Sequence, residues 1–446
     1  MAAARGEFTS RFGFLMAAVG SAVGLGNIWG FPTNTASNGG AAFLFTYLIM
    51  AFALAYPALM AELIIGRHAR ANAVTALKSI SPKPLSRYAA VTVGFVGIVT
   101  VSFILSFYAI VSGWMMAFFL DPLARLLGLN ALAGWLTTDA ELRNGLFVVA
   151  FMLLTVSIIS AGVRDGIEKW ASRLMPSLIL ILFLLILYVF TLPGAMQGLR
   201  AYLLPDFSLI ADPTLIVDAM GQAFFSLSLG VGTMLIYGSY INKDENLPVV
   251  GSLVALLDVG IAVLAGLLIL PAMYVAQNNG VQIYDASGGL IAGPGLIVSV
   301  LPSLFNTMGV IGLLISFAFF ALMTIASLTS SISMLEVPVA YGVENHGVER
   351  RRAAMLIGLA ITLISLAIVL SFDPWFDRVV TWTTEVSQPL LGFCFCVFVA
   401  WIWQRNEVLA EIKRGCPMAE NGLFWKIWPF YVKFICPLAI LLVYFQ

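Results

Sequence analysis

Long apolar stretches recur along this chain, and they constrain its fold more than any other feature of the sequence. Eleven are present, near residues 12–35, 42–66, 90–119, 144–162, 174–192, 214–240, 248–275, 307–341, 354–371, 379–403 and 425–445. A helix of about 20 apolar residues crosses a bilayer, and lipid offers the backbone no partner outside its own helix. The chain is 61% hydrophobic and 10% charged, against about 25% charged in soluble proteins. We therefore predict an all-α, polytopic membrane protein with eleven transmembrane helices.

The uneven distribution of Lys and Arg among the predicted loops indicates the orientation. With the N-terminus inside, the cytoplasmic segments hold eighteen of these residues and the outer segments four, while Lys433 lies within the last span. Positive charge concentrates on the cytoplasmic side of membrane proteins. We therefore expect a cytoplasmic N-terminus, an extracellular C-terminus and a location in the cell membrane. No polar linker divides the chain, so residues 1–446 are expected to form one membrane domain.

Small and polar residues interrupt two of the apolar stretches. Ser21-Ala-Val-Gly-Leu-Gly-Asn27 interrupts the first, and Ser226-Leu-Ser-Leu-Gly-Val-Gly-Thr233 interrupts the sixth. Paired glycines weaken a helix interior, and unwound backbone at membrane depth is tolerated only inside protein or along a cavity. Breaks at corresponding places in two halves of a chain indicate a transporter's binding site near the bilayer midplane. The glycine pattern alone would also suit close packing of helices.

The two broken spans divide the chain into two sets of five helices. Because five is odd, the second set must start from the opposite side of the membrane, which makes the two sets an inverted repeat. We expect the first repeat over about 11–192 and the second over about 213–404, followed by an extra helix over about 425–445. In this architecture the two halves move around a central site.

Oxygen-bearing side chains lie at membrane depth in four of the predicted spans. They are Asn27, Ser226 with Ser228, Asp258, and the run Ala326-Ser-Leu-Thr329-Ser-Ser331. Hard cations such as sodium prefer oxygen ligands, and an intramembrane carboxylate is a functional candidate because of its cost in lipid. Two other interpretations stay open: Asp258 could join two helices by a hydrogen bond, and Thr329 and Ser330 could bond back to their own helix.

In combination these motifs resemble the neurotransmitter:sodium symporter family, along essentially the whole chain and particularly its bacterial branch of hydrophobic amino acid transporters. The segments that carry the resemblance are Gly24-Leu-Gly-Asn-Ile-Trp-Gly-Phe-Pro32, Asn38-Gly-Gly-Ala-Ala-Phe43, Gly162-Val-Arg-Asp-Gly-Ile-Glu-Lys169 with Met175-Pro176, Gly221-Gln-Ala-Phe-Phe-Ser-Leu-Ser-Leu-Gly-Val-Gly232 and Ser327-Leu-Thr-Ser-Ser331. The resemblance implies a LeuT-type fold with broken helices 1 and 6. It also implies coupling to sodium at two sites and alternating access to a central substrate.

The resemblance further implies which residues hold the two sodium ions. The first set would be the Ala22 carbonyl, Asn27, Ser226 and Asp258, with the substrate's own carboxylate. The second set would be the carbonyls of Gly20, Val23 and Ala326 with the hydroxyls of Thr329 and Ser330. Some relatives have Asn where this chain has Asp258, and the fixed negative charge predicts transport without chloride.

A substrate site across the two breaks follows from the same resemblance. Backbone amides and Tyr108 would meet the carboxylate, backbone carbonyls and Ser228 would meet the ammonium, and an uncharged wall would take the side chain. The expected contacts are Ser21, Ala22, Leu25, Gly26, Ile104, Tyr108, Phe225, Ser226, Ser228, Val231, Ser330 and Met334. Burying a charged side chain against such a wall is costly, so neutral hydrophobic L-amino acids, aliphatic and aromatic, are the expected substrates.

Gating residues are also implied by the resemblance, with one departure. Arg5 and Glu344, with Tyr240 nearby, would close the inner side, and an unwinding segment between Gly166 and Pro176 would release sodium. On the outer side Gly30 follows Trp29 where relatives have Arg, so no ion pair with Asp377 is assigned. Solvated charges at the membrane edge are the alternative interpretation for the inner pair.

Two other classes of function compete with a sodium symporter. One is a proton-coupled permease of the same general fold, with Asp258 carrying the proton. The other is a membrane enzyme. We do not expect one, because His68 and His346 both lie in predicted cytoplasmic loops and no acid–base pair appears within the predicted spans. The expected partners are the substrate and the lipid bilayer, without nucleic acid. The oligomeric state is left open.

Overall fold

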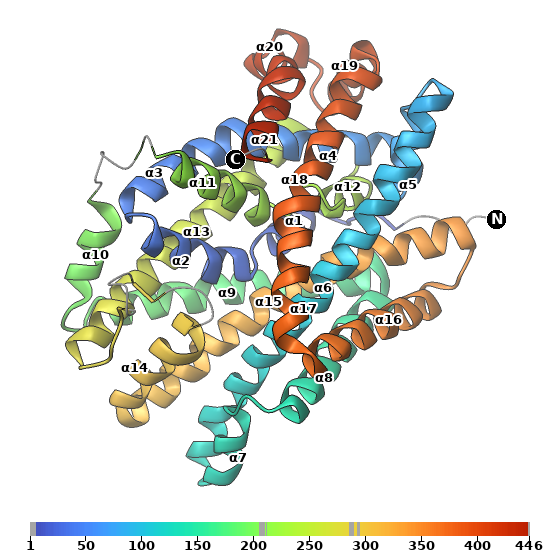
Figure 1. Ribbon diagram of the computed structural model, residues 1–446. Coiled ribbons are helices and arrows are strands. Elements are labelled where there is room, and N and C mark those ends of the chain that lie inside the picture. The colour runs from blue at the N-terminus through green and yellow to red at the C-terminus, as the bar shows by residue number, and fades with distance from the viewer. Residues whose placement is uncertain (1–5, 205–209, 211, 285–289, 292–294, 445–446) are drawn as a thin grey trace.

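A computed structural model describes residues 6–204, 210, 212–284, 290–291 and 295–444, and over these ranges the chain is almost entirely helical (Figure 1). The one β contact among the described residues is an isolated bridge between Tyr284 and Leu290. Nine helices in this part of the chain are long and apolar enough to cross a membrane, and a strongly bent pair makes ten. The all-α prediction is confirmed.

The first half of the chain contains five helical spans and three short connecting helices. The spans are α1 (Arg11–Ala22) with η1 (Gly26–Gly30) and α2 (Phe31–Ser37); α3 (Ala41–Met50) with η2 (Ala51–Ala55) and α4 (Tyr56–Ala69); α6 (Pro84–Leu126); α8 (Glu141–Ser160); and η3 (Val163–Glu168) with α9 (Lys169–Val189). The connecting helices are α5 (Ala73–Ser79), α7 (Asn130–Leu136) and α10 (Ala195–Leu203).

The second half follows the same order and ends with an additional hairpin. Its spans are α11 (Pro213–Ser226) with α12 (Thr233–Gly238); α13 (Leu247–Asn278); α15 (Gly309–His346); α16 (Arg350–Leu370); and α17 (Phe372–Val380) with η6 (Thr381–Ser387), α18 (Gln388–Val397) and η7 (Phe398–Ile402). Between α13 and α15 lie η5 (Leu296–Val300) and α14 (Leu301–Thr307). The hairpin consists of α19 (Arg405–Lys413), η8 (Ala419–Asn421), and a last span of α20 (Leu423–Phe430), η9 (Tyr431–Ile435) and α21 (Cys436–Tyr444).

Both predicted breaks are present. Helix α1 ends at Ala22, and the helical turns that resume at Gly26 are bent by 54° from it. Helix α11 ends at Ser226, and regular helix resumes only at Thr233. The pieces α11 and α12 have 14 and 6 residues, so this segment falls short of the length of a continuous span. The predicted total of eleven transmembrane helices therefore stays a prediction.

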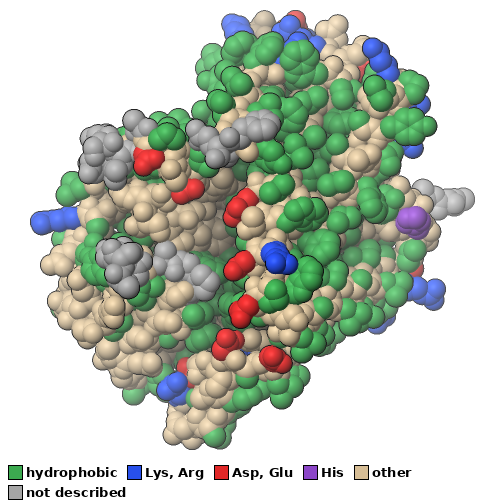
Figure 2. Space-filling model, in the orientation of Figure 1, with side chains coloured by type: hydrophobic (Ala, Val, Ile, Leu, Met, Phe, Trp, Pro, Cys, Tyr) green, Lys and Arg blue, Asp and Glu red, His purple; other side chains and the backbone are tan. Residues whose placement is uncertain are grey.

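The broken spans lie at the centre of the molecule. Helix α1 packs against α9, α13 and α15, while α15 also packs along α6. The outer helix α16 carries exposed leucines, with Leu356 64% and Leu363 58% exposed. Hydrophobic side chains cover much of the outer surface in Figure 2, and acidic side chains gather along the middle of the face shown. A bilayer requires an apolar exterior, and it tolerates broken helices only where they lie inside the protein.

Candidate functional site

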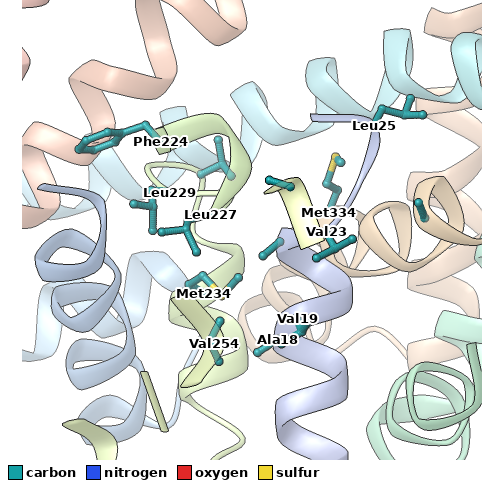
Figure 3. Packing of buried hydrophobic residues seen from close by; sticks show 14 of the residues in the cluster. Ala18, Val19, Val23, Leu25, Phe224, Leu227, Leu229, Met234, Val254 and Met334 are labelled. Carbon is teal, nitrogen blue, oxygen red and sulfur yellow. The ribbon is translucent and has the colours of Figure 1, made fainter. Parts of the chain in front are cut away.

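A small cavity of about 30 Å³ lies between the two breaks. In Figure 3, Val23 and Leu25 mark the break after α1, and Leu227 and Leu229 mark the unwound segment after α11 on the opposite side. The residues that line the cavity are Ser21, Ala22, Gly24, Gly26, Ile104, Tyr108, Phe225, Ser228, Val231, Thr233, Ser330, Met334 and Gln388. The structure thus brings ten of the twelve predicted substrate contacts to one cavity; Leu25 and Ser226 lie beside it without lining it. Pockets for small ligands commonly measure about 300–1,000 Å³, so the walls of this cavity would have to move apart to admit an amino acid.

The break in the first span turns backbone amides toward Tyr108. The amide of Leu25 donates a 3.0 Å hydrogen bond to the Tyr108 hydroxyl. A Cβ atom at Gly24 would lie 2.6 Å from that hydroxyl and 2.5 Å from the Ser330 hydroxyl. Only glycine therefore allows α6 and α15 to approach the unwound backbone this closely.

The break in the sixth span has a strained backbone, held in place by its neighbours. Ser228 has φ +52°, and Gly230 and Gly232 have φ +83° and +80°. The Ser228 hydroxyl donates to the Ser21 carbonyl at 2.9 Å, which joins the two breaks directly. A Cβ at Gly230 would lie 2.2 Å from the carbonyl oxygen of Gln388, so the unwound segment lies directly against α18.

Asn27, Ser226 and Asp258 form one hydrogen-bonded group, although they come from three different spans. The Asn27 amide nitrogen donates to Asp258 Oδ1 at 2.7 Å and to the Ser226 hydroxyl at 2.8 Å. The Ser226 hydroxyl in turn donates to Asp258 Oδ2 at 2.7 Å. All three side chains are at most 1% exposed. The remaining Asn27 oxygen accepts a 3.2 Å bond from the amide of Gly24.

Oxygen atoms from α15 and the end of α1 meet on the other side of the break. The Ser330 hydroxyl lies 3.3 Å from the Gly20 carbonyl oxygen and 3.2 Å from that of Val23. The Thr329 hydroxyl lies 3.0 Å from the Ala326 carbonyl oxygen, within its own helix. A Cβ at Gly20 would lie 3.1 Å from Thr329 Cβ, so the two helices touch at this point. The predicted set of five residues is therefore contiguous.

Two buried acids also lie within spans, and our reading of the sequence did not single them out. Glu62 of α4 is 1% exposed and accepts bonds from the backbone amides of Gly230 at 2.7 Å and Leu235 at 3.3 Å. It satisfies donors that the break after α11 leaves without helical partners. Glu336 of α15 is 0% exposed. The signal for both was available, since a buried acid is costly wherever it lies in a span.

Two glutamines near the breaks were missed as well. The Gln222 amide nitrogen donates to the Gly26 carbonyl at 2.7 Å, and the Gln222 oxygen accepts from the Asn34 amide at 3.0 Å. The Gln388 amide nitrogen donates to the Leu229 carbonyl at 2.9 Å. Each glutamine thus binds a carbonyl that a broken helix exposes, and no local pattern of sequence indicates such distant partners.

Two acids of α15 lie near the residues predicted for the inner gate. Glu336 accepts a 2.5 Å bond from the Tyr240 hydroxyl and forms an ion pair with Arg350. Glu344 accepts bonds from the backbone amide and the side-chain amide of Asn72, at 2.7 and 2.9 Å. Its predicted partner Arg5 lies outside the described residues. Tyr240 thus binds Glu336, and the gating role predicted for Tyr240 and Glu344 stays a prediction.

The segment before α1 is fastened to the start of the fifth span. Thr9 donates to Glu168 through its amide at 2.8 Å and through its hydroxyl at 2.7 Å. A Cβ at Gly166 would lie 2.1 Å from the carbonyl oxygen of Ile158, so this turn packs tightly on the end of α8. The stretch from Gly166 to Pro176 is helical here, with π-helical turns over Val163–Glu168.

Gln222 lies beside Gly30, the position at which the family resemblance leads us to expect Arg. A Cβ at Gly30 would lie 3.3 Å from the Gln222 side-chain oxygen. Trp29 is partly buried, and Asp377 is exposed on α17.

Comparison with known proteins identifies the fold and the family. The model of the Sodium:neurotransmitter symporter family matches residues 5–144 and 136–446. An uncharacterized sodium-dependent transporter of Bacillus subtilis, YhdH, is 33% identical over 98% of this chain and 96% of its own length. The bovine sodium- and chloride-dependent taurine transporter is 28% identical over 90% of this chain and 72% of its own.

A solved structure resembles the whole molecule. It is MhsT in complex with L-phenylalanine, which is 35% identical, covers 99% of both chains and superposes with a TM-score of 0.85. This neighbour confirms the LeuT-type arrangement expected from the two breaks. Since the family model covers nearly the entire sequence, this chain belongs to the sodium:neurotransmitter symporter family.

Proposed function

We propose that this protein imports neutral hydrophobic L-amino acids, aliphatic and aromatic, together with sodium and without chloride. The observation that carries the proposal is the group of Asn27, Ser226 and Asp258 buried beside a cavity between two broken helices. A sodium ion in that group would lie next to the carboxylate of a bound amino acid. Each ion then favours the binding of the other, which is the physical basis of coupled transport.

The unwound backbones are suited to a zwitterion. The amides of Gly24 and Leu25, which now donate to Asn27 and Tyr108, would turn to the carboxylate together with the Tyr108 hydroxyl, because backbone N–H groups without helical partners favour anions. The Ser21 and Phe225 carbonyls and the Ser228 hydroxyl would accept hydrogen bonds from the ammonium. The side chain would then lie along Ile104, Val231 and Met334. The neighbour MhsT is described with L-phenylalanine, which supports an apolar and partly aromatic substrate range.

Sodium binding at the first site requires a turn of one amide. Asn27 now directs its nitrogen to Asp258 and its oxygen to the amide of Gly24. Rotation of the amide by half a turn would bring its oxygen to the ion with those of Ser226, Asp258 and the Ala22 carbonyl. Five or six oxygens suit a hard monovalent cation, and the substrate's carboxylate would complete the set.

A second ion would hold α1 against α15. Its ligands would be the Gly20, Val23 and Ala326 carbonyls with Thr329 and Ser330, which already lie together. Release of this ion to the cytoplasm would follow opening of the fifth span between Gly166 and Pro176. The contacts of Glu336 with Tyr240 and Arg350 would have to separate in the same step.

Chloride independence follows from the charge of Asp258. Two sodium ions and a zwitterion add positive charge to a buried site, and a fixed carboxylate balances part of it. The bovine relative is named as sodium- and chloride-dependent, so this property is where the two proteins would differ. Replacing chloride with gluconate should leave uptake by this protein unchanged, and a dependence on chloride would contradict the assignment.

Uptake into proteoliposomes tests the proposed function. Purified full-length protein should accumulate radiolabelled leucine and tryptophan when sodium is higher outside, and should not do so when potassium replaces sodium. Lysine and glutamate should fail to compete. Uptake driven by a pH gradient in the absence of sodium would instead support the proton-coupled permease, with Asp258 as the proton carrier.

A further inference from the structure

Gln388 lines the central cavity, and its buried side-chain oxygen has no hydrogen-bond partner. The side chain is 3% exposed, and Gln388 lines the cavity together with Val231 and Thr233. Among the described residues that line this cavity, Gln388 alone has a buried side-chain oxygen or nitrogen without a hydrogen-bond partner, namely its oxygen. A buried acceptor without a partner is costly, so such a group in a ligand cavity indicates a ligand donor.

The orientation of the Gln388 amide is determined by its surroundings. Its nitrogen donates to the Leu229 carbonyl at 2.9 Å, and a carbonyl can only accept. The oxygen therefore cannot exchange places with the nitrogen without losing that bond. The main chain of Gln388 is also immobilised, because its carbonyl lies against Gly230 of the unwound segment. The acceptor is thus preorganised rather than free to turn away.

From this we infer that Gln388 selects amino acids whose aromatic side chain carries a ring N–H, and we propose that L-tryptophan is bound through its indole nitrogen by the Gln388 oxygen. The inference rests on the proposed function. Ile104, Val231 and Met334 line the same cavity, so the rest of the preferred side chain should be apolar.

The donor and acceptor chemistry of the wall narrows the choice of side chain. Indole has one donor and no acceptor, which matches one unused oxygen in an apolar wall. The amide side chains of asparagine and glutamine would bring an acceptor of their own, which this wall would leave unpaired. A lysine ammonium would have to lose its water in a site that offers it no carboxylate beyond Asp258. The Thr233 hydroxyl also lines the cavity, but its hydrogen is already used in a 2.8 Å bond to the Ser228 carbonyl, so it differs from Gln388 in having a partner.

A comparison of two ligands tests the role of the indole N–H. Tryptophan and 3-(3-benzothienyl)-L-alanine have nearly the same shape, but sulfur replaces the N–H in the second. Their sodium-dependent affinities would be measured by displacement of radiolabelled leucine from purified full-length protein. We expect tryptophan to bind at least about tenfold more tightly than the analogue, the usual effect of leaving a buried polar group unpaired. Equal affinities in the unmodified protein would overturn the proposal, whatever any variant does.

Two variants assign the difference to Gln388. In Gln388→Met the ratio of the affinities for tryptophan and the analogue should fall to about one. Leucine affinity is measured in the same variant, because the substitution also removes the bond to the Leu229 carbonyl. The control is Gln282→Met, since Gln282 is exposed and its amide also donates to a backbone carbonyl, that of Tyr284, at 2.9 Å. The control should keep the full preference. If Gln388→Met retains the preference, Gln388 is not the selecting residue. If neither leucine nor tryptophan binds in sodium, the proposed function itself has failed.

Discussion

Replacement of Asp258 by asparagine should weaken sodium binding and make transport respond to chloride. The carboxylate is fully buried, and both of its oxygens accept 2.7 Å hydrogen bonds, from Asn27 and Ser226. A sodium ion about 4 Å from the charge would be attracted by about 4 kcal/mol at an effective dielectric constant of about 20. The loss is partly offset, because a neutral amide is less costly to bury than a carboxylate. We therefore expect sodium affinity to fall by about 10- to 100-fold, or about 1.4 to 2.8 kcal/mol.

The assay is the sodium dependence of leucine uptake by Asp258→Asn in proteoliposomes, in chloride and in gluconate. The half-saturating sodium concentration should rise, and chloride should recover part of the lost transport because an anion can replace the missing charge. Asp373→Asn is the matched control, since Asp373 is exposed on α17 and its loss should change neither quantity. An unchanged sodium curve in Asp258→Asn would refute the reasoning, because a carboxylate that touches the ion cannot be removed without effect.

Three further predictions concern other parts of the site. Gly24→Ala should reduce leucine affinity at least about tenfold, because its Cβ would lie 2.6 Å from the Tyr108 hydroxyl. Gly97→Ala is the control and should leave the affinity unchanged, since a Cβ there meets nothing within 4 Å. Equal leucine affinities of the two variants in equilibrium binding would contradict this prediction. Glu336→Gln should weaken the contacts that close the inner side by about 3 kcal/mol, because Arg350 loses a buried partner. Hydrogen exchange in residues 8–22 should then become faster. Pro176→Ala should straighten the fifth span and slow inward sodium release several-fold in efflux assays; an unchanged rate would make the kink architectural.

The sequence could predict those parts of the fold that depend on local composition. Glycine pairs at membrane depth located both breaks, because the cost of glycine in a helix interior does not depend on distant residues. The oxygens of Asn27 and Asp258 could be placed at a site because a polar group in lipid always needs a partner. The length of the apolar stretches predicted the spans. The sixth span is the exception, because its two pieces α11 and α12 are each shorter than a continuous span.

Contacts between remote elements could not be predicted in the same way. Glu62 binds backbone amides 168 and 173 positions away, and Gln388 binds a carbonyl 159 positions away. Only the folded arrangement of helices shows that these side chains satisfy the broken sixth span. Glu336 illustrates a further limit, because the sequence did not indicate that it would accept a bond from Tyr240 and form an ion pair with Arg350.

The most direct test of the central claim is equilibrium binding of radiolabelled leucine to purified protein across a range of sodium concentrations, with potassium keeping ionic strength constant. If the ion and the amino acid share the site formed by the two breaks, leucine affinity should rise with sodium by at least about tenfold, and saturating leucine should raise sodium affinity by the same factor. A leucine affinity that does not change between sodium and potassium would contradict the account, because it would separate the substrate from the ion.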